Sequence, residues 1–334
     1  MIDIEFKARN EEWELFLKGH PESNIFHTHE WKQLIENTYN YKSLYMFAKN
    51  EEGTLTGLLP IFYVKSKLTG RRLCSVPFSH MCGALGDEYS KKALYKTLFV
   101  MYNEMSADLI EIRQNEKFFG FKPSNKLSTY VLDINDNLKF SLNKSIRRYV
   151  NKAEEQNETV ISNDRDAIGE FYEINCLNKK KNRVTCPPLK FFVNIAKYLD
   201  EKAAFHFVYN QGRMIGGAVS LDYNKDRLSY YIGCTHPKHY DKFTSYSYIW
   251  SMANECHKRG IPSLDLGPSS PDPDNTLTSF KIRWGGREES MQYSYYPSVP
   301  SYETKQSISH KLIGIMPNSL YKRYSNMVFS KTVN

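Results

Sequence analysis

Hydrophobic and polar residues follow the same plan in two successive blocks of the chain. In the first block their spacing predicts helices over 11–18, 30–37 and 90–105, and strands over 44–48, 54–64, 72–76, 108–113 and 128–134. In the second block the spacing predicts a helix over 167–177, another that ends near residue 199, and a third over 246–259. It also predicts strands over 205–209, 214–222, 227–233 and 263–267. The order helix, helix, antiparallel meander, helix, strand occurs twice. A duplicated α/β domain is therefore expected.

The length of 334 residues agrees with two domains, because one hydrophobic core rarely serves so long a chain. We expect an N-terminal domain over 1–140, a connecting basic helix over 141–160, a C-terminal catalytic domain over 161–300 and a helical tail over 301–334.

The connecting helix is amphipathic, with one apolar face and one basic face. At 100° per residue, one face carries apolar side chains, namely Leu142, Ile146, Tyr149, Val150 and Ala153. The opposite face carries cations, namely Lys144, Arg148 and Lys152, with Arg147 at its edge. This stripe is either a solvated surface or a ridge that binds substrate phosphate. Lys144, Arg147 and Arg148 are the binding candidates.

Composition and charge indicate the kind of partner and the cellular compartment to expect. The net charge of +8 and a pI near 8.9 attract polyanions, although many basic proteins bind no nucleic acid. Six cysteines without a CxxC pair indicate reduced thiols in the cytosol. The first residues lack the apolar core of a signal peptide, and Pro60 interrupts the longest apolar stretch. We expect a cytoplasmic protein whose membrane contact, if any, is peripheral.

The tail over 307–331 is the candidate for such a contact. It carries Leu312, Ile315, Met316 and Leu320 among Lys311, Lys322, Arg323 and Lys331. Packing against the protein body or a partner chain is one interpretation of this pattern. Contact with an anionic membrane is the other.

Four segments in order resemble the Fem-type aminoacyltransferases that build peptidoglycan bridges, and their acetyltransferase-like relatives. They are FHTHEW from Phe26, SIRRYVNKA from Ser145, LDLG from Leu264 and SFKIRWGG from Ser279. The resemblance implies an α/β fold of two fused acetyltransferase-like (GNAT) domains, each a mostly antiparallel mixed sheet flanked by helices.

The resemblance also places the reaction centre at Phe280 and Lys281, which match the Phe-Lys pair of that family. Attack on an ester or thioester passes through a tetrahedral oxyanion, which a fixed ammonium in a dry cleft would stabilise. We expect Lys281 on the last strand of the second domain, with Phe280 shaping the site. Asp265 is either a turn cap or a residue that orients Lys281.

Further substrate contacts are expected around this centre. Lys179 and Arg183 belong to a basic stretch before Pro187, which we expect on a loop beside the cleft. One of Tyr230 and Tyr231 should face the cleft, and Tyr231 is the candidate. Trp31, at the end of the first resembling segment, is a further binding candidate. His236 and His239 lack a third ligand, so no metal is expected.

The acyl donor is inferred from a loop in which this sequence differs from coenzyme A-dependent acetyltransferases. Acetyltransferases of this fold hold the coenzyme A pyrophosphate with a glycine-rich loop before a helix, whereas residues 236–246 here contain no glycine. This favours charged tRNA as the donor. The resemblance implies an envelope precursor, a nucleotide- or lipid-linked sugar, as the acceptor. No tightly bound cofactor and no DNA are expected. An N-acyltransferase that uses acyl-coenzyme A on an amino sugar is the alternative, and a non-catalytic module that binds RNA or polymer is another.

Overall fold

The chain builds two α/β units from the two blocks of its sequence. The computed structural model describes residues 2–67, 69–116, 120–300 and 312–332. Unit 1 comprises Met1–Lys126, Met291–Ser301 and Ser330–Asn334, and unit 2 comprises Leu127–Ser290 and Tyr302–Phe329. The divisions fall within two long strands, β9 (Lys122–Asp133) and β15 (Arg287–Tyr296). Residues 127–160 therefore group with unit 2, and 291–300 with unit 1, unlike the ranges expected from the sequence.

Unit 1 contains three α-helices among its described residues, α1 (Asn10–Gly19), α2 (His29–Tyr39) and α3 (Glu88–Glu104). Its shorter strands are β1 (Asp3–Glu5), β2 (Lys42–Ser43), β3 (Met46–Lys49), β4 (Leu55–Leu59), β5 (Phe62–Ser66), β6 (Gly70–Cys74), β7 (Leu85–Gly86) and β8 (Leu109–Arg113). They form a sheet in the order β1-β3-β4-β7 and a second run in the order β15-β8-β6-β5-β2. Strands β6 and β8 are parallel, because α3 lies between them in the chain.

Local sequence explains the helices of unit 1. Thr28 caps α2, since its hydroxyl accepts a hydrogen bond from the N–H of Trp31. Helix α3 buries Leu94, Leu98 and Met101, which recur at helical spacing.

Unit 2 repeats this plan with longer strands. Its helices are α4 (Leu138–Ser141), α5 (Lys144–Gln156), α6 (Arg165–Lys181), α7 (Leu189–Leu199), α8 (Thr244–Arg259), α9 (Thr276–Arg283) and α11 (Asn318–Thr332). Its strands, besides most of β9, are β10 (Glu158–Ile161), β11 (Ala203–Asn210), β12 (Arg213–Asn224), β13 (Arg227–Thr235) and β14 (Ser263–Ser269). Their order is β10-β11-β12-β13-β14-β9, and all neighbours are antiparallel except β13 and β14.

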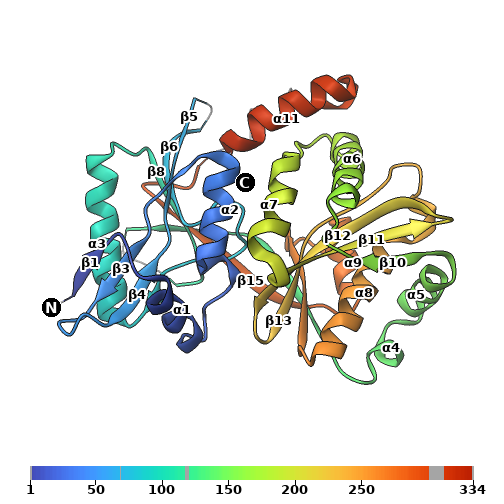
Figure 1. Cartoon of the computed structure of the whole chain (residues 1–334), viewed down its shortest axis with the longest axis horizontal. Coiled ribbons are helices and arrows are strands. Elements are labelled where there is room, and N and C mark those ends of the chain that lie inside the picture. Colours follow the sequence, from blue (N-terminus) through green and yellow to red (C-terminus); the bar gives the residue numbers. More distant parts are fainter. Residues whose placement is uncertain (1, 68, 117–119, 301–311, 333–334) are drawn as a thin grey trace. The chain divides into compact units, whose positions relative to one another are not determined.

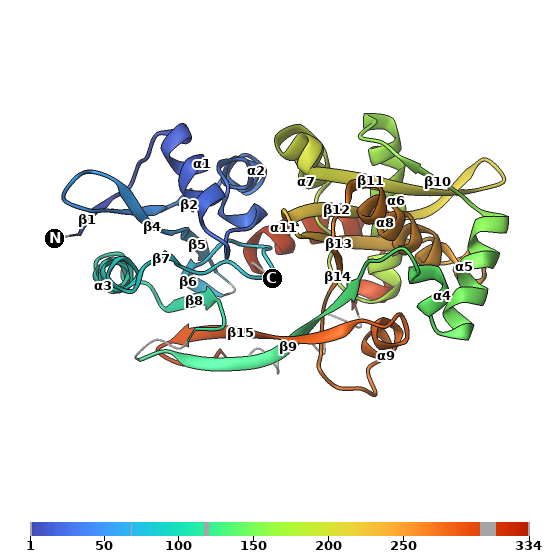
Figure 2. The same cartoon turned by 90° about the horizontal axis from the view of Figure 1, so that it is seen from below.

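Helices cover both faces of the unit 2 sheet. Helices α6 and α7 lie on one face, above the strands in Figure 1, and α8 lies on the other. Figure 2, seen from below, places α8 in front of strands β11 to β13. The apolar residues of α8 and β14 join those of α5 in one core, which buries Ile146, Val150 and Ala153 as the amphipathic pattern predicts. The chain thus has the α/β GNAT architecture that the sequence predicts.

Candidate active site

The proposed catalytic residue Lys281 lies on helix α9, and the prediction that it lies on the last strand is wrong. Asn275 caps this helix, since its side-chain oxygen accepts hydrogen bonds from the N–H groups of Leu277 and Thr278. Thr278, Lys281 and Trp284 recur every three residues and are all buried. Helical spacing therefore turns the lysine toward the interior of unit 2.

The ammonium group of Lys281 is fixed by backbone oxygens. Its side chain is almost fully buried, and Nζ donates to the carbonyl oxygens of Gly267 at 2.7 Å and Pro268 at 2.9 Å. These carbonyls are available because the pairing of β14 with β9 shifts register between Asp265 and Pro268. Gly267, at φ +78°, permits this bulge.

Burial sets the charge balance of this site. It lowers the pKa of Lys281 to about 8, and the nearby Asp265 carboxylate opposes that shift. Burial also raises the pKa of Asp265, whose carboxylate accepts hydrogen bonds from the Thr129 hydroxyl and the Gly267 N–H. Asp265 thus holds the bulge and lies close enough to influence Lys281. It combines the two roles that the sequence leaves open, a turn residue and an electrostatic partner.

This arrangement suits acyl transfer. A protonated lysine carries three N–H groups, and the two carbonyls use two of them. The third has no hydrogen-bond partner among the described residues, so a bound carbonyl oxygen could accept from it. In the neutral amine the same two hydrogen bonds would leave the lone pair for an incoming proton. A pKa of about 8 brings both forms within reach of neutral pH.

A row of aromatic side chains links α9 to the basic helix α5. We call it the aromatic row, and it comprises Tyr149, Phe243, Tyr246, Phe280 and Trp284. Neighbouring ring centres lie 5.1–5.9 Å apart from Phe243 through Tyr149 and Tyr246 to both Phe280 and Trp284. Phe280 is half-buried, and Trp284 is packed in the core.

Two cations of α5 flank this row. The Arg148 guanidinium lies 5.1 Å from the Tyr149 ring centre, and Lys152 Nζ lies 5.6 Å from that of Phe243. Phe243 itself has φ +54° and immediately precedes α8. The basic stripe predicted from the sequence therefore adjoins aromatic rings at the start of α8.

The other sequence candidates lie in varied surroundings. Lys144 is exposed, and Arg147 donates to the Phe140 carbonyl oxygen at 3.2 Å. Tyr231 is half-buried, with its ring 6.3 Å from that of Phe191 on α7. Trp31 is fully buried in the core of unit 1.

The basic stretch before Pro187 is only partly a loop. Helix α6 continues through Lys179 to Lys181, so the prediction of a loop there is wrong for Lys179. Three lysines in the last turn fit the negative end of the helix dipole. Arg183, at φ +60°, is exposed beyond the helix end.

Sequence reasoning missed three parts of the site. Thr129 and the carbonyl of Pro268 carry no motif, since one acts through a partner far along the chain and the other through its backbone. Tyr246 was assigned only to a helix start. The Gly267-Pro268 pair, which begins with the last residue of LDLG, was the available signal, because Gly-Pro commonly marks a break in regular structure.

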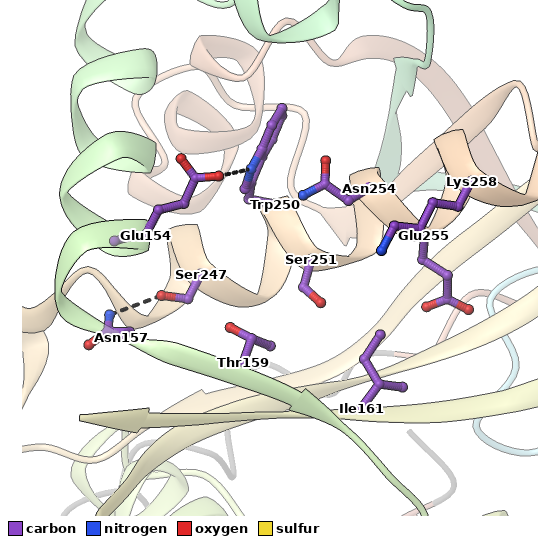
Figure 3. A pocket seen from close by; sticks show the side chains of 11 residues that line it. Glu154, Asn157, Thr159, Ile161, Ser247, Trp250, Ser251, Asn254, Glu255 and Lys258 are labelled. Atoms are coloured by element: carbon purple, nitrogen blue, oxygen red, sulfur yellow. Dashed lines mark hydrogen bonds between the residues drawn. The ribbon is translucent and has the colours of Figure 1, made fainter. Parts of the chain in front are cut away.

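A cavity of about 350 Å³ opens elsewhere in unit 2, between α5, β10 and α8. Figure 3 shows Glu154 accepting from Trp250 Nε1 at 2.7 Å and Asn157 donating to Ser247 at 2.9 Å. None of the site residues predicted from the sequence lines it. Its mixed charges, from Glu154, Glu255 and Lys258, give it no evident preference for an anion.

Comparison with known families identifies the class. Residues 141–275 match the family model described as acetyltransferase (GNAT) domain. This region spans the basic helix, the meander and α8, together with Asp265 and Gly267. The match covers this part of unit 2, and the α/β fold of the unit agrees with it.

Solved structures give a more particular likeness. FemX matches with a TM-score of 0.69 and 15% identity, covering 93% of this chain and all of that one. L-PGS from Bacillus licheniformis matches with a TM-score of 0.59 and 12% identity, covering 92% and 98%. A tandem GNAT protein from the clavulanic acid biosynthesis pathway matches with a TM-score of 0.58 and 10% identity, covering 90% and 100%. A search among curated proteins finds no match. The Fem-type resemblance of the sequence therefore extends to the fold.

Proposed function

We propose that this chain transfers an aminoacyl group from charged tRNA to an amine or hydroxyl of a cell-envelope precursor, of peptidoglycan or polysaccharide type. The observation that carries the proposal is the buried Lys281 ammonium, held by two backbone carbonyls with one N–H left over. Charged tRNA is a cytoplasmic donor, so the proposal places the reaction in the cytoplasm.

Lys281 would act on the oxyanion. Attack on the aminoacyl ester moves negative charge onto the former carbonyl oxygen, and a fixed donor in a dry site stabilises that charge. The two carbonyl contacts fix the ammonium before the reaction, so little reorganisation is needed. Phe280, one residue earlier and half-buried, would bound the site.

The aromatic row and its cations support tRNA as the donor. The end of a tRNA acceptor arm is single-stranded, and proteins bind such strands by stacking bases on aromatic rings beside cations. Arg148 and Lys152 adjoin this row, and Lys144 and Arg147 extend the same basic helix. The likeness to FemX supports this class of reaction at the level of the fold.

An N-acyltransferase that uses acyl-coenzyme A on an amino sugar is the second candidate, because the matching family model is that of an acetyltransferase. The buried Thr244 hydroxyl at the start of α8 also lacks a hydrogen-bond partner among the described residues. In this candidate α8 would face a pyrophosphate, although the preceding residues contain no glycine.

Two experiments test the proposal: one distinguishes the two acyl donors, and the other tests the role of Lys281. Purified chain should release the amino acid from charged tRNA only when an envelope-precursor acceptor is present, and acetyl-coenzyme A should leave its melting temperature unchanged. Lys281→Met should lower turnover by roughly 10²-fold or more, because one oxyanion donor is lost. Lys242→Met, on the loop before α8, is the matched control and should retain most of the turnover.

Turnover by Lys281→Met at the wild-type rate would remove the catalytic assignment. A clear thermal shift with micromolar acetyl-coenzyme A, together with acyl transfer from it, would show that acyl-coenzyme A and not charged tRNA is the donor.

A further inference from the structure

The C-terminal tail presents one side to unit 2 and the other to solvent. On the inner side, Tyr321 is 1% exposed, and its hydroxyl donates to the Val184 carbonyl oxygen at 2.8 Å. Lys322 pairs with Glu173 of α6 at 2.5 Å, and Ile313 is buried. Helix α11 is thereby fixed on unit 2 by the side that carries Tyr321 and Lys322.

The tail also exposes apolar side chains, two in the helical turn before α11 and one on α11 itself. Ile315 is 80% exposed, and Leu312 and Leu320 are about half exposed. Large aliphatic residues grouped on a surface indicate a binding site more often than isolated ones do. We call Leu312, Ile315 and Leu320 with their neighbouring cations Arg183 and Arg323 the tail face.

Cations accompany these apolar residues without anions of the same segment. From residue 304 to the end, the sequence has four lysines and one arginine but no aspartate or glutamate. Arg323 is exposed on α11. Arg183 comes from beyond the end of α6, and a Cβ at Gly314 would lie 3.6 Å from its Nε. The tail face is therefore both apolar and positively charged.

We propose that the tail face binds the surface of an anionic lipid bilayer. Ile315, Leu312 and Leu320 enter the headgroup region, and Arg183 and Arg323 contact lipid phosphates. No helix among the described residues is both long and apolar enough to cross a membrane. The proposal does not depend on the transferase reaction. If the acceptor is lipid-linked, the contact holds the enzyme where that acceptor resides.

Charge selects the membrane over a second copy of the chain. A two-fold contact between two tail faces would bring Arg183 and Arg323 of both copies together, and like charges at an interface are unfavourable. An anionic bilayer offers the opposite charge and an apolar layer in the same plane.

Flotation of the full chain with lipid vesicles tests this inference. The chain should float with vesicles of equal parts phosphatidylglycerol and phosphatidylcholine, and far less with phosphatidylcholine alone. Ile315→Asp combined with Leu320→Asp should weaken partition to the anionic vesicles at least tenfold, and so should Arg183→Glu combined with Arg323→Glu. Raising NaCl from 0.05 M to 0.5 M should weaken wild-type binding, because the phosphate contacts are screened.

Leu15→Asp is the matched control, since Leu15 of α1 is 73% exposed in unit 1. It should float like the wild type, and all variants should keep the wild-type melting temperature because the altered side chains lie at the surface. Equal flotation with neutral vesicles, or no flotation, would overturn the proposal. So would a dimer in gel filtration that Ile315→Asp disperses, which would make the tail face a contact between copies. Vesicle binding without any transferase activity would instead refute the proposed function alone.

Discussion

At the scale of single residues, Lys281 combines a charge with an interior position. An isolated buried cation is costly, and two carbonyl oxygens and the nearby Asp265 offset only part of that cost, so its pKa falls to about 8. Such a cost at one position is typical of functional sites. Among the described residues of unit 2, this is the feature that most clearly indicates chemistry rather than packing.

The lowered pKa gives a prediction that needs no substrate. In the unfolded chain Lys281 keeps its ordinary pKa of 10.5, so between pH 8 and 10.5 the unfolded state binds more protons than the folded state. The stability of the wild type relative to Lys281→Met should therefore rise with pH across this window, by at most about 3 kcal/mol. Urea unfolding of both proteins at pH 7.5 and pH 10 measures it. A constant difference would show that the lysine is solvated like any surface lysine.

At the scale of elements, the bulge in β14 connects backbone conformation to the site. Its Gly267 has φ +78°, and an added Cβ would lie 3.0 Å from the Tyr230 carbonyl oxygen. The same residue supplies a carbonyl to Lys281. Strain introduced here would therefore reach the ammonium directly.

Gly267→Ala should lower the free energy of unfolding by about 1–2 kcal/mol and turnover at least tenfold, because the carbonyls that hold Lys281 must move. Gly212→Ala is a matched control, since Gly212 has φ +72° with nothing near its Cβ position. It should show a similar loss of stability with full turnover. Equal turnover in both variants would separate the bulge from catalysis.

Helix α5 meets the aromatic row through two of its cations. Charge reversal by Arg148→Glu with Lys152→Glu should raise the Michaelis constant for charged tRNA several-fold at low salt and less at high salt, because phosphate contacts are screened. Steady-state kinetics at two salt concentrations measure this. Lys92→Glu with Lys96→Glu on α3 makes the same change of charge in unit 1 and should leave the constant nearly unaltered. An equal effect of the two pairs would mean that only net charge matters.

At the scale of the whole molecule, segments distant in the sequence complete each unit. Unit 1 takes residues from β15, and unit 2 takes α11 from the end of the chain. Tyr321 packs this helix against Val184 and is nearly inaccessible to solvent. The stability of unit 2 should therefore depend on the last residues of the chain.

Tyr321→Ala should lower the free energy of unfolding of unit 2 by roughly 3 kcal/mol, because a large buried side chain is removed. Tyr321→Phe should cost about 1 kcal/mol, the value of one hydrogen bond. Tyr324→Ala, at a half-buried position on the same helix, should cost less than Tyr321→Ala. Thermal and urea unfolding give these values. Equal costs at 321 and 324 would contradict the observed side of contact.

Much of the fold could be predicted from local patterns. The buried face of α5, the Thr28 cap of α2 and the left-handed Gly260 after α8 all follow from spacing and residue type. The repeated order of elements indicated the duplicated architecture for the same reason. These features depend on side chains a few residues apart, which the linear sequence displays directly.

Local patterns thus predicted the two α/β blocks and the basic stripe, and the family resemblance pointed to Lys281 as the candidate lysine. The SFKIRW segment, however, alternates apolar and polar residues like a strand, and only the Asn275 cap and the burial of Thr278, Lys281 and Trp284 made it a helix. The tertiary structure alone decided that Lys281 is buried and that Trp31 is core. The carbonyls come from β14, 14 and 13 positions before the lysine, where a bulge exposes them. That bulge depends on pairing with β9, where Thr129 lies 136 positions before Asp265, and no local pattern records such a distant partner.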